Sequence, residues 1–215
     1  MHRFVRTCLA TALVGTALGA TAAPASADRW WGRDHAGDVE QVTLSPEPPP
    51  CGTYALTRAP QDRSTDIVGL SVVHGRDDIV LRAHYRDLSG WAGRSVTFAL
   101  ATDRRDYEVQ VWGRRPVEVE VWSAPSEPEP TGQCDTYITS QIGGACDALL
   151  RVAPDRAVIE VAVPRTCVGD PHWVRAGVRN DRMIGGRYRS DVWGRSDIGS
   201  ILDDAPLSPR VRHGS

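Results

Sequence analysis

Apolar and polar residues alternate in short runs along this chain, which is the pattern of strands that bury one face. No window carries an apolar stripe of helical period over ten or more residues, so we expect little helix. The alternation predicts about ten short strands, at residues 39–44, 53–57, 67–74, 79–86, 96–102, 107–112, 117–122, 148–152, 157–163 and 174–180.

Turn-forming residues separate these runs. Residues 74–78, 113–116 and 154–156 each join two runs closely enough to form a hairpin. Short strands joined by such turns and by a few longer crossovers predict an all-β fold, namely an antiparallel β-sandwich of the jelly-roll kind.

The first 27 residues have the three parts of a secretory signal peptide. Arg3 and Arg6 form a basic start, residues 9–20 are apolar, and Ala25-Ser26-Ala27 is a small-residue cleavage site. The apolar part is too short for a permanent anchor, and no later segment approaches the roughly 20 apolar residues of a membrane span. We therefore expect a secreted, extracellular protein without membrane insertion.

Cleavage after Ala27 would leave 188 of the 215 residues, which is enough for one domain with its own core. We assign residues 28–200 to a single β-sandwich and expect residues 201–215, which carry no periodicity, to form a disordered tail. All 25 basic residues are arginines and two lie in the signal segment, so 23 arginines face 27 acidic residues, a net charge of −4. That balance argues against a general nucleic-acid binder.

The triplet Trp-Gly-Arg begins at Trp31, Trp112 and Trp193, at even intervals of 81 residues. An internal duplication would produce such spacing. Because the residues between the triplets share little identity, we favour chance over duplication.

Four cysteines remain after the signal segment, at Cys51, Cys134, Cys146 and Cys167. In an exported protein an even number favours disulfides over a zinc site, which would require Cys-x-x-Cys pairs that the chain lacks. Three pairings of two bridges are possible. We favour Cys146–Cys167, because these residues flank the open end of the hairpin at 148–163, and this choice leaves Cys51–Cys134.

Residues 157–173, AVIEVAVPRTCVGDPHW, have the composition of either a catalytic elbow or a strand corner held by a disulfide. The chain contains no Gly-x-Ser-x-Gly, Cys167 is expected to be oxidised, and His172 has no nucleophile close in sequence. Pro164 ends the strand and Gly169-Asp170-Pro171 supplies a turn. We favour the corner, although Asp170 and His172 could still join distant residues in a site.

Residues 163–175, together with the hairpin at 67–86, the Asp87-Leu88 that follows it and the strand at 96–103, resemble a group of secreted actinobacterial proteins. The strand order is also distantly similar to the sandwich of family 9 carbohydrate-binding modules and DOMON-like domains. The resemblance spans residues 66–180 and implies a secreted β-sandwich. It transfers no ligand-binding residue, because no aromatic of those modules is placed here by a motif.

The hairpin at 107–122 offers a candidate ligand site. Its alternation sends five valines inward, at Val109, Val111, Val117, Val119 and Val121. Tryptophan rings stack on the C–H faces of sugars and carboxylates accept from hydroxyls, so the outward face is a hypothetical sugar-binding platform. The alternative, and the commoner arrangement, is that both rings cap the sheet or lie under a proline-rich loop. The outward residues are Glu108, Gln110, Trp112, Glu118, Glu120 and Trp122.

Two outward basic rows could bind an anionic wall polymer. More often such rows are solvated or pair with carboxylates on neighbouring strands, and we favour that arrangement. One row is Arg82, His84 and Arg86, and the other is Arg175 and Arg179.

No metal or cofactor is assigned from the sequence. Acidic turns would allow an extracellular Ca²⁺ site, but none has EF-hand spacing. A haem would need axial ligands, whereas Met183 is the single methionine after the signal segment and Cys-x-x-Cys-His does not occur. The acidic turns are at Asp77-Asp78, Asp103, Asp106 and Asp203-Asp204.

These observations favour a non-catalytic secreted protein that recognises an extracellular carbohydrate or cell-wall polymer. The alternative is a cell-surface structural or protein-interaction domain without a small ligand, and the third hypothesis is a secreted hydrolase. Joint exposure of Trp112 and Trp122 would favour the first, and a continuous apolar patch the second. A cleft that gathers His84 or His172 with carboxylates would favour the third.

Overall fold

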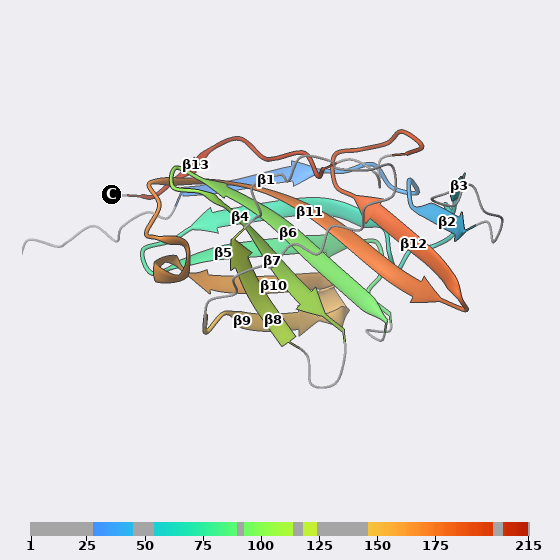
Figure 1. Cartoon of the computed structure of the whole chain (residues 1–215), viewed down its shortest axis with the longest axis horizontal. Coiled ribbons are helices and arrows are strands. Elements are labelled where there is room, and N and C mark those ends of the chain that lie inside the picture. The colour runs from blue at the N-terminus through green and yellow to red at the C-terminus, as the bar shows by residue number, and fades with distance from the viewer. Residues whose placement is uncertain are drawn as a thin grey trace, which may run out of the picture.

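The computed structural model describes residues 28–44, 54–89, 93–113, 118–123, 146–199 and 204–214. Within these ranges thirteen strands form two antiparallel sheets, which pack face to face as a β-sandwich (Figure 1). The helical elements described there are two 3-10 turns, at Pro154–Arg156 and Arg165–Val168. The predicted all-β antiparallel sandwich with little helix is confirmed. No helix in this part of the chain is long and apolar enough to cross a membrane.

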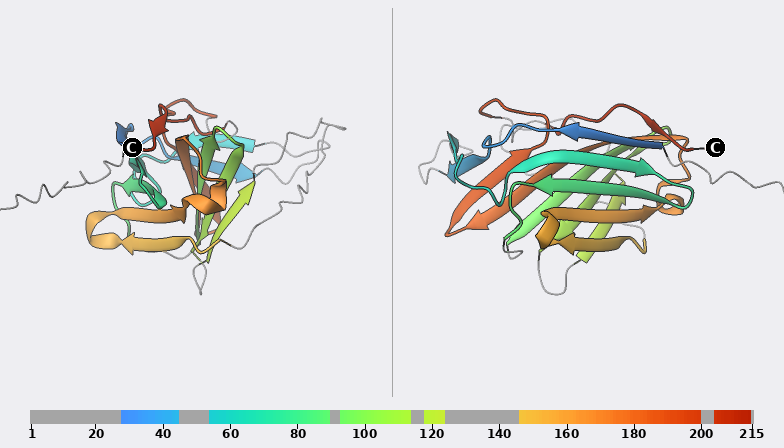
Figure 2. Two further views of the ribbon diagram at one scale, coloured as in Figure 1. Left: turned by 90° about the vertical axis from the view of Figure 1, so that its left-hand side faces the viewer. Right: turned by 180° about the vertical axis from the view of Figure 1, so that it is seen from behind.

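The two sheets differ in size, and their strands cross obliquely, as the right-hand view of Figure 2 shows. The five-stranded sheet contains, in spatial order, β1 (Asp28–Arg33), β4 (Ile67–His74), β5 (Asp78–Tyr85), β10 (Val158–Pro164) and β9 (Leu149–Ala153). The eight-stranded sheet contains β3 (Tyr54–Arg58), β2 (Glu40–Leu44), β12 (Arg187–Val192), β11 (Trp173–Ile184), β6 (Arg94–Thr102), β7 (Asp106–Trp112) and β8 (Glu118–Ser123), with β13 (Val211–Arg212) paired to β11.

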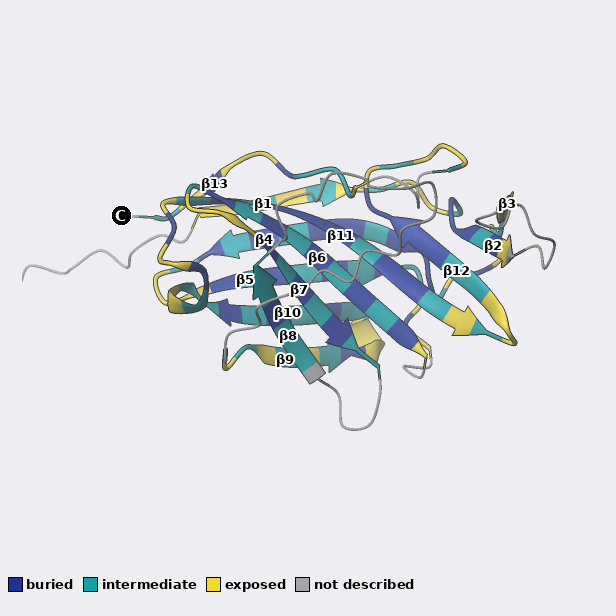
Figure 3. Cartoon of the chain, viewed as in Figure 1, coloured by how far each residue is buried: buried dark blue, intermediate teal, exposed yellow. Residues whose placement is uncertain are grey.

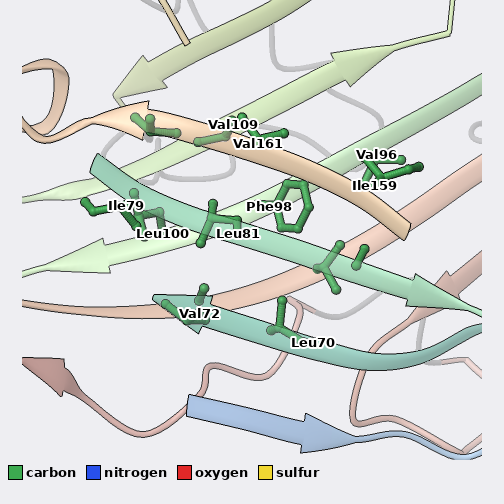
Figure 4. Packing of buried hydrophobic residues seen from close by; sticks show 14 of the residues in the cluster. Leu70, Val72, Ile79, Leu81, Val96, Phe98, Leu100, Val109, Ile159 and Val161 are labelled. Carbon is green, nitrogen blue, oxygen red and sulfur yellow. The ribbon is translucent and has the colours of Figure 1, made fainter. Parts of the chain in front are cut away.

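Alternate side chains of the strands fill the space between the sheets, because successive residues of a strand point to opposite faces. Every second residue of β6 is buried, and burial alternates in the same way along β5 (Figure 3). Leu70 and Leu81 from the five-stranded sheet belong to the same apolar cluster as Phe98 and Leu100 from the other (Figure 4). Burying one such side chain contributes roughly 1.5–3 kcal/mol, so this cluster is the main stabilising element.

The ten predicted strands are all present, and all but one agree with the structure within two residues at each end. The exception is β11, which we expected to stop at Asn180 but which continues to Ile184 and pairs with the unpredicted β12. Asn180 is fully buried, and its Nδ2 donates to the carbonyl of Thr65 at 2.8 Å. A polar residue can therefore occupy the interior of this strand, because a hydrogen bond satisfies its side chain.

Residues 204–214 form an ordered segment instead of the disordered tail that we expected, and we name this segment the C-terminal strap. It runs along the first half of β11 and is coloured red in Figure 1. Ser208 is fully buried, and its amide donates to the Ala176 carbonyl at 2.8 Å. Its Oγ accepts from the Ala176 amide at 3.0 Å. Single contacts of this kind leave no periodic signal in the sequence, which explains the wrong expectation.

The end of the strap is held by pairing to the sandwich. Val211–Arg212, as β13, pairs with Trp173 and Val174 of β11. Nδ1 of the buried His74 lies 3.2 Å from the Val211 carbonyl oxygen. Burial lowers the pKa of His74 below its ordinary value, so a neutral ring donates this hydrogen bond. The strap is thus anchored to both sheets.

Cys146 and Cys167 form a disulfide, with their Cα atoms 5.7 Å apart. The bond joins the residues before β9 to the 3-10 turn that follows β10, at the open end of the β9–β10 hairpin. Both cysteines pack against the apolar cluster. This pairing confirms the prediction, whereas Cys51 and Cys134 lie outside the described residues, so their pairing stays a prediction.

Non-reducing peptide mapping of the purified protein should recover Cys146 linked to Cys167. Replacing both by serine should lower the free energy of unfolding by about 3 kcal/mol, because the bond closes a loop with a sequence separation of 21. Thermal unfolding of the parent and the double variant measures this difference. A free thiol at Cys167 in the mapped parent would contradict the assignment.

Candidate functional site

The outer face of the eight-stranded sheet carries rows of side chains set by the pairing register. Because the strands bury alternate residues, the residues between them face outward and meet their cross-strand neighbours. One row contains Arg179, Thr97, Gln110 and Glu120, and the next contains Gly177, Ala99, Glu108 and Trp122.

A groove of about 370 Å³ lies on this face. Its floor includes three short outward side chains of β6, which leave a hollow between larger neighbours: Thr97, Ala99 and Ala101. The strap forms one side with Asp204, Ala205 and Leu207, and β7 contributes Asp106 and Glu108 on the other. Arg179 of β11 also lines the groove.

Gly177 allows the strap to approach β11 closely enough to form this wall. A Cβ at Gly177 would lie 2.5 Å from the Pro206 carbonyl oxygen and 3.0 Å from the Ala205 Cβ. Arg175 holds the strap from the same strand, because its Nε donates to the Ser208 carbonyl at 2.8 Å. The absence of a side chain at Gly177 is therefore a requirement of the wall.

One carboxylate holds the two predicted tryptophans. Trp112 and Trp122 are half-buried on the outer face, and their indole Nε1 atoms donate to Oε2 of Glu120 at 3.3 Å and 3.2 Å. Beside them Gln110 Nε2 donates to Glu108 Oε2 at 3.0 Å. Rings that are fixed before binding lose little conformational freedom when a ligand stacks on them.

The six residues predicted as a platform are placed as follows. Five have the expected outward orientation, and of these Glu108 lines the groove, whereas the other four lie beside it on β7 and β8. Both tryptophans are half-buried, an exposure that suits a platform as well as a cap. The Glu118 side chain and Val117 lie outside the described residues. The five are Glu108, Gln110, Trp112, Glu120 and Trp122.

The two basic rows are engaged within the protein, which is the arrangement that we favoured. Each of these guanidinium groups has a partner within the protein. Arg82 pairs with Glu160, Arg86 with Asp66 at 2.7 Å, and Arg179 with Asp181 at 3.1 Å, while Arg175 bonds to the strap.

Neither candidate catalytic histidine lies in the groove. His84 is on the five-stranded sheet, where its Nε2 lies 3.3 Å from Ser71 Oγ and burial lowers its pKa. His172 is exposed before β11, and its amide donates to Asp103 Oδ1 at 2.8 Å. Asp170, with φ of 50°, belongs to the turn between β10 and β11. These positions agree with the corner and give no support to a catalytic elbow.

Sequence reasoning missed most of the groove. Thr97, Ala99 and Ala101 were visible as small outward residues in a predicted strand, but three small residues do not reveal a hollow without their neighbours. The strap wall had no signal, because it depends on contacts with β11 that are distant in sequence. Among the lining residues, only Glu108 had been assigned to the predicted sugar-binding platform, whereas Arg179 belonged to a basic row and Asp106 and Asp204 to the acidic turns.

Comparison with known proteins gives no match, since no family model, no curated protein and no solved structure is similar to the chain. The resemblance carried by residues 163–175 therefore stays a prediction. The function must therefore be inferred from the groove and from the two tryptophans that Glu120 holds beside it.

The Gly177→Ala substitution should push the strap away from β11. The added methyl group meets backbone, which cannot rotate aside, so we expect a loss of about 1–3 kcal/mol in the free energy of unfolding. Hydrogen exchange should show the amides of Ala176 and Ser208 losing protection, while amides of the β4–β5 hairpin exchange as in the parent. Ser208→Ala, which removes the Oγ acceptor, is expected to affect the Ala176 amide similarly. Unchanged protection in Gly177→Ala would show that the strap does not depend on this contact.

Proposed function

We propose that this protein is secreted and that it binds an extracellular carbohydrate or cell-wall polymer along the groove, without catalysing a reaction. The observation that carries the proposal is the combination of a hollow on one sheet face with two fixed tryptophans beside it. Export is supported by the signal-like first 27 residues and by the Cys146–Cys167 disulfide.

The groove has the chemistry that a sugar needs. Indole faces contact the C–H faces of a ring, and carboxylate, amide and guanidinium groups exchange hydrogen bonds with hydroxyls. Trp122 lies directly across from Glu108, so a stacked ring and a hydroxyl acceptor are adjacent. The volume of about 370 Å³ is near the lower end of the range for small-ligand sites, which suits a short stretch of a polymer.

The groove is less suited to hydrolysis. Asp106 and Asp204, two of its carboxylates, are exposed, whereas a catalytic acid is typically set in an apolar pocket that excludes water. The histidines considered for a hydrolase, His84 and His172, lie elsewhere.

Two of the four large apolar side chains that are exposed in the described residues lie too far apart to form one surface. Trp31 and Leu149 are 50% and 72% exposed, but they lie on β1 and β9, which are opposite edges of the five-stranded sheet. These two cannot belong to one continuous patch, which a protein-interaction surface would show.

Retention on insoluble polysaccharide and on isolated cell wall tests the proposal. Trp112→Ala and Trp122→Ala should each weaken binding by ~1–2 kcal/mol, about 5–30-fold, with little change in melting temperature. Ala99→Phe should block the floor of the groove and weaken binding without removing any hydrogen bond.

The matched control is Ala162→Phe, another outward alanine in the interior of a strand, placed on β10 of the other sheet. It should bind as the parent does. Binding unchanged in Ala99→Phe and in both tryptophan variants would overturn the groove as the binding site. Unfolding of both tryptophan variants would show instead that the rings act as structural caps.

A further inference from the structure

Four aspartates meet where three segments of the chain come together, away from the outer face. Asp34 and Asp38 belong to the connection between β1 and β2, Asp66 directly precedes β4, and Asp191 lies on β12. Hydrogen bonds fix this meeting point: the Gly37 amide donates to Asp66 Oδ2 at 2.8 Å. The Ile67 amide donates to Asp191 Oδ2 at 2.6 Å.

Three of these carboxylates are arranged as ligands of one ion would be. Asp38, Asp66 and Asp191 are 7%, 0% and 2% exposed, and each offers an oxygen within 4.8 Å of the others. Calcium bonds to oxygen at about 2.3–2.6 Å, so two ligands on opposite sides of the ion lie about 4.6–5.2 Å apart. Oxygens this close can therefore share a single cation.

The oxygens of this cluster lack the partners that buried acceptors normally have. Both carboxylate oxygens of Asp38 are buried without a hydrogen-bond partner among the described residues. The same holds for Oδ1 of Asp66 and Oδ2 of Asp34. In the part of the chain that the structure describes, every buried carboxylate oxygen without a partner belongs to these residues. A cation bound at this point would satisfy all of these acceptors at once.

The positively charged groups around the cluster are fewer than its carboxyl groups. Arg86 pairs with Asp66 at 2.7 Å, and Arg58 attracts Asp38 while its Nη1 donates to the Asp38 carbonyl at 2.6 Å. Two guanidinium groups thus face four carboxyl groups. The nearby Asp62 does not change this balance, because Arg189 pairs with it at 3.0 Å. With all four carboxyl groups ionised, the surplus would be two negative charges, which equals the charge of one divalent cation.

Burial makes this surplus expensive to maintain. It raises the pKa of Asp34 to about 7 and that of Asp38 to about 6, and it also raises the pKa values of Asp66 and Asp191. Repulsion between the carboxylates adds to the effect of burial. A bound cation would relieve both costs.

We propose that Asp38, Asp66 and Asp191 bind one Ca²⁺ ion, with Asp34 beside them. The donors are all oxygen, without cysteine or histidine in the set, which favours a hard cation over zinc or copper. The ion would join the start of β4 in one sheet to β12 in the other, so its role would be to tie the sandwich together. The cluster shares no residue with the groove, so this proposal does not rest on the proposed sugar ligand.

Calorimetry with calcium chloride on the chelator-treated, disulfide-bonded protein tests the site directly. Binding of about one ion per chain is expected, and calcium at 100 times its dissociation constant should raise the melting temperature by about 5–10 °C. Sodium chloride at the same ionic strength controls for screening. No heat of binding together with no shift in melting temperature would overturn the proposal.

Asp38→Asn and Asp191→Asn separate a calcium site from a merely structural cluster. Each keeps one side-chain oxygen and removes a carboxyl group whose ionisation burial disfavours, so in chelator both variants should melt at or above the temperature of the parent while losing the calcium-dependent rise. Asp155→Asn, in the exposed turn between β9 and β10, is the matched control and should keep the full rise. A full calcium response in both cluster variants would place the ion elsewhere and overturn the assignment.

Discussion

The segment Thr65-Asp66-Ile67 is the point on which the sandwich depends beyond its apolar packing. Its backbone enters the five-stranded sheet at β4, yet it is hydrogen-bonded to side chains of the other sheet. Asn180 of β11 donates to Thr65, and Ile67 donates to Asp191 of β12. Apolar contacts are tolerant of small slides between sheets, whereas buried hydrogen bonds fix a register because a lost partner costs about 1–3 kcal/mol. These two hydrogen bonds therefore determine how the two sheets are positioned relative to one another.

Opposite faces of the same strands perform different tasks. The inward residues of β11 and β6 complete the core, and their outward residues form the floor of the groove. The strap turns that floor into a groove by passing over Gly177, where the backbones approach too closely for any other residue. The proposed ligand contacts would thus lie on regular strands supported from behind by a packed core, and such support keeps a binding site in one geometry.

The fold was predictable because alternation reports a buried face directly, as β4 illustrates with both ends correct. The predicted structure was wrong where contacts between residues distant in sequence, and not a periodic pattern, determine the fold. Asn180 is polar in sequence but buried in the structure, and the strap is held by single contacts such as that of Ser208 with Ala176. The outward orientation of Trp112 and Trp122 followed from the same alternation. The aspartate cluster did not, because Asp38, Asp66 and Asp191 come from separate elements, and only the tertiary structure brings their oxygens together.

The aspartate cluster includes Asp191 of β12, and the groove is lined by Arg179 of β11, the strand that pairs with β12. Val192 pairs with Arg179, which lines the groove, and the amide of Trp193 donates to the Val178 carbonyl at 3.0 Å. Asp191, the preceding residue, points inward to the cluster. Any group that holds Asp191 firmly also holds the end of β12 against β11, next to Arg179. Such a group would pre-organise one end of the groove. It would change ligand affinity only if β11 and β12 depart from this register in the unliganded protein.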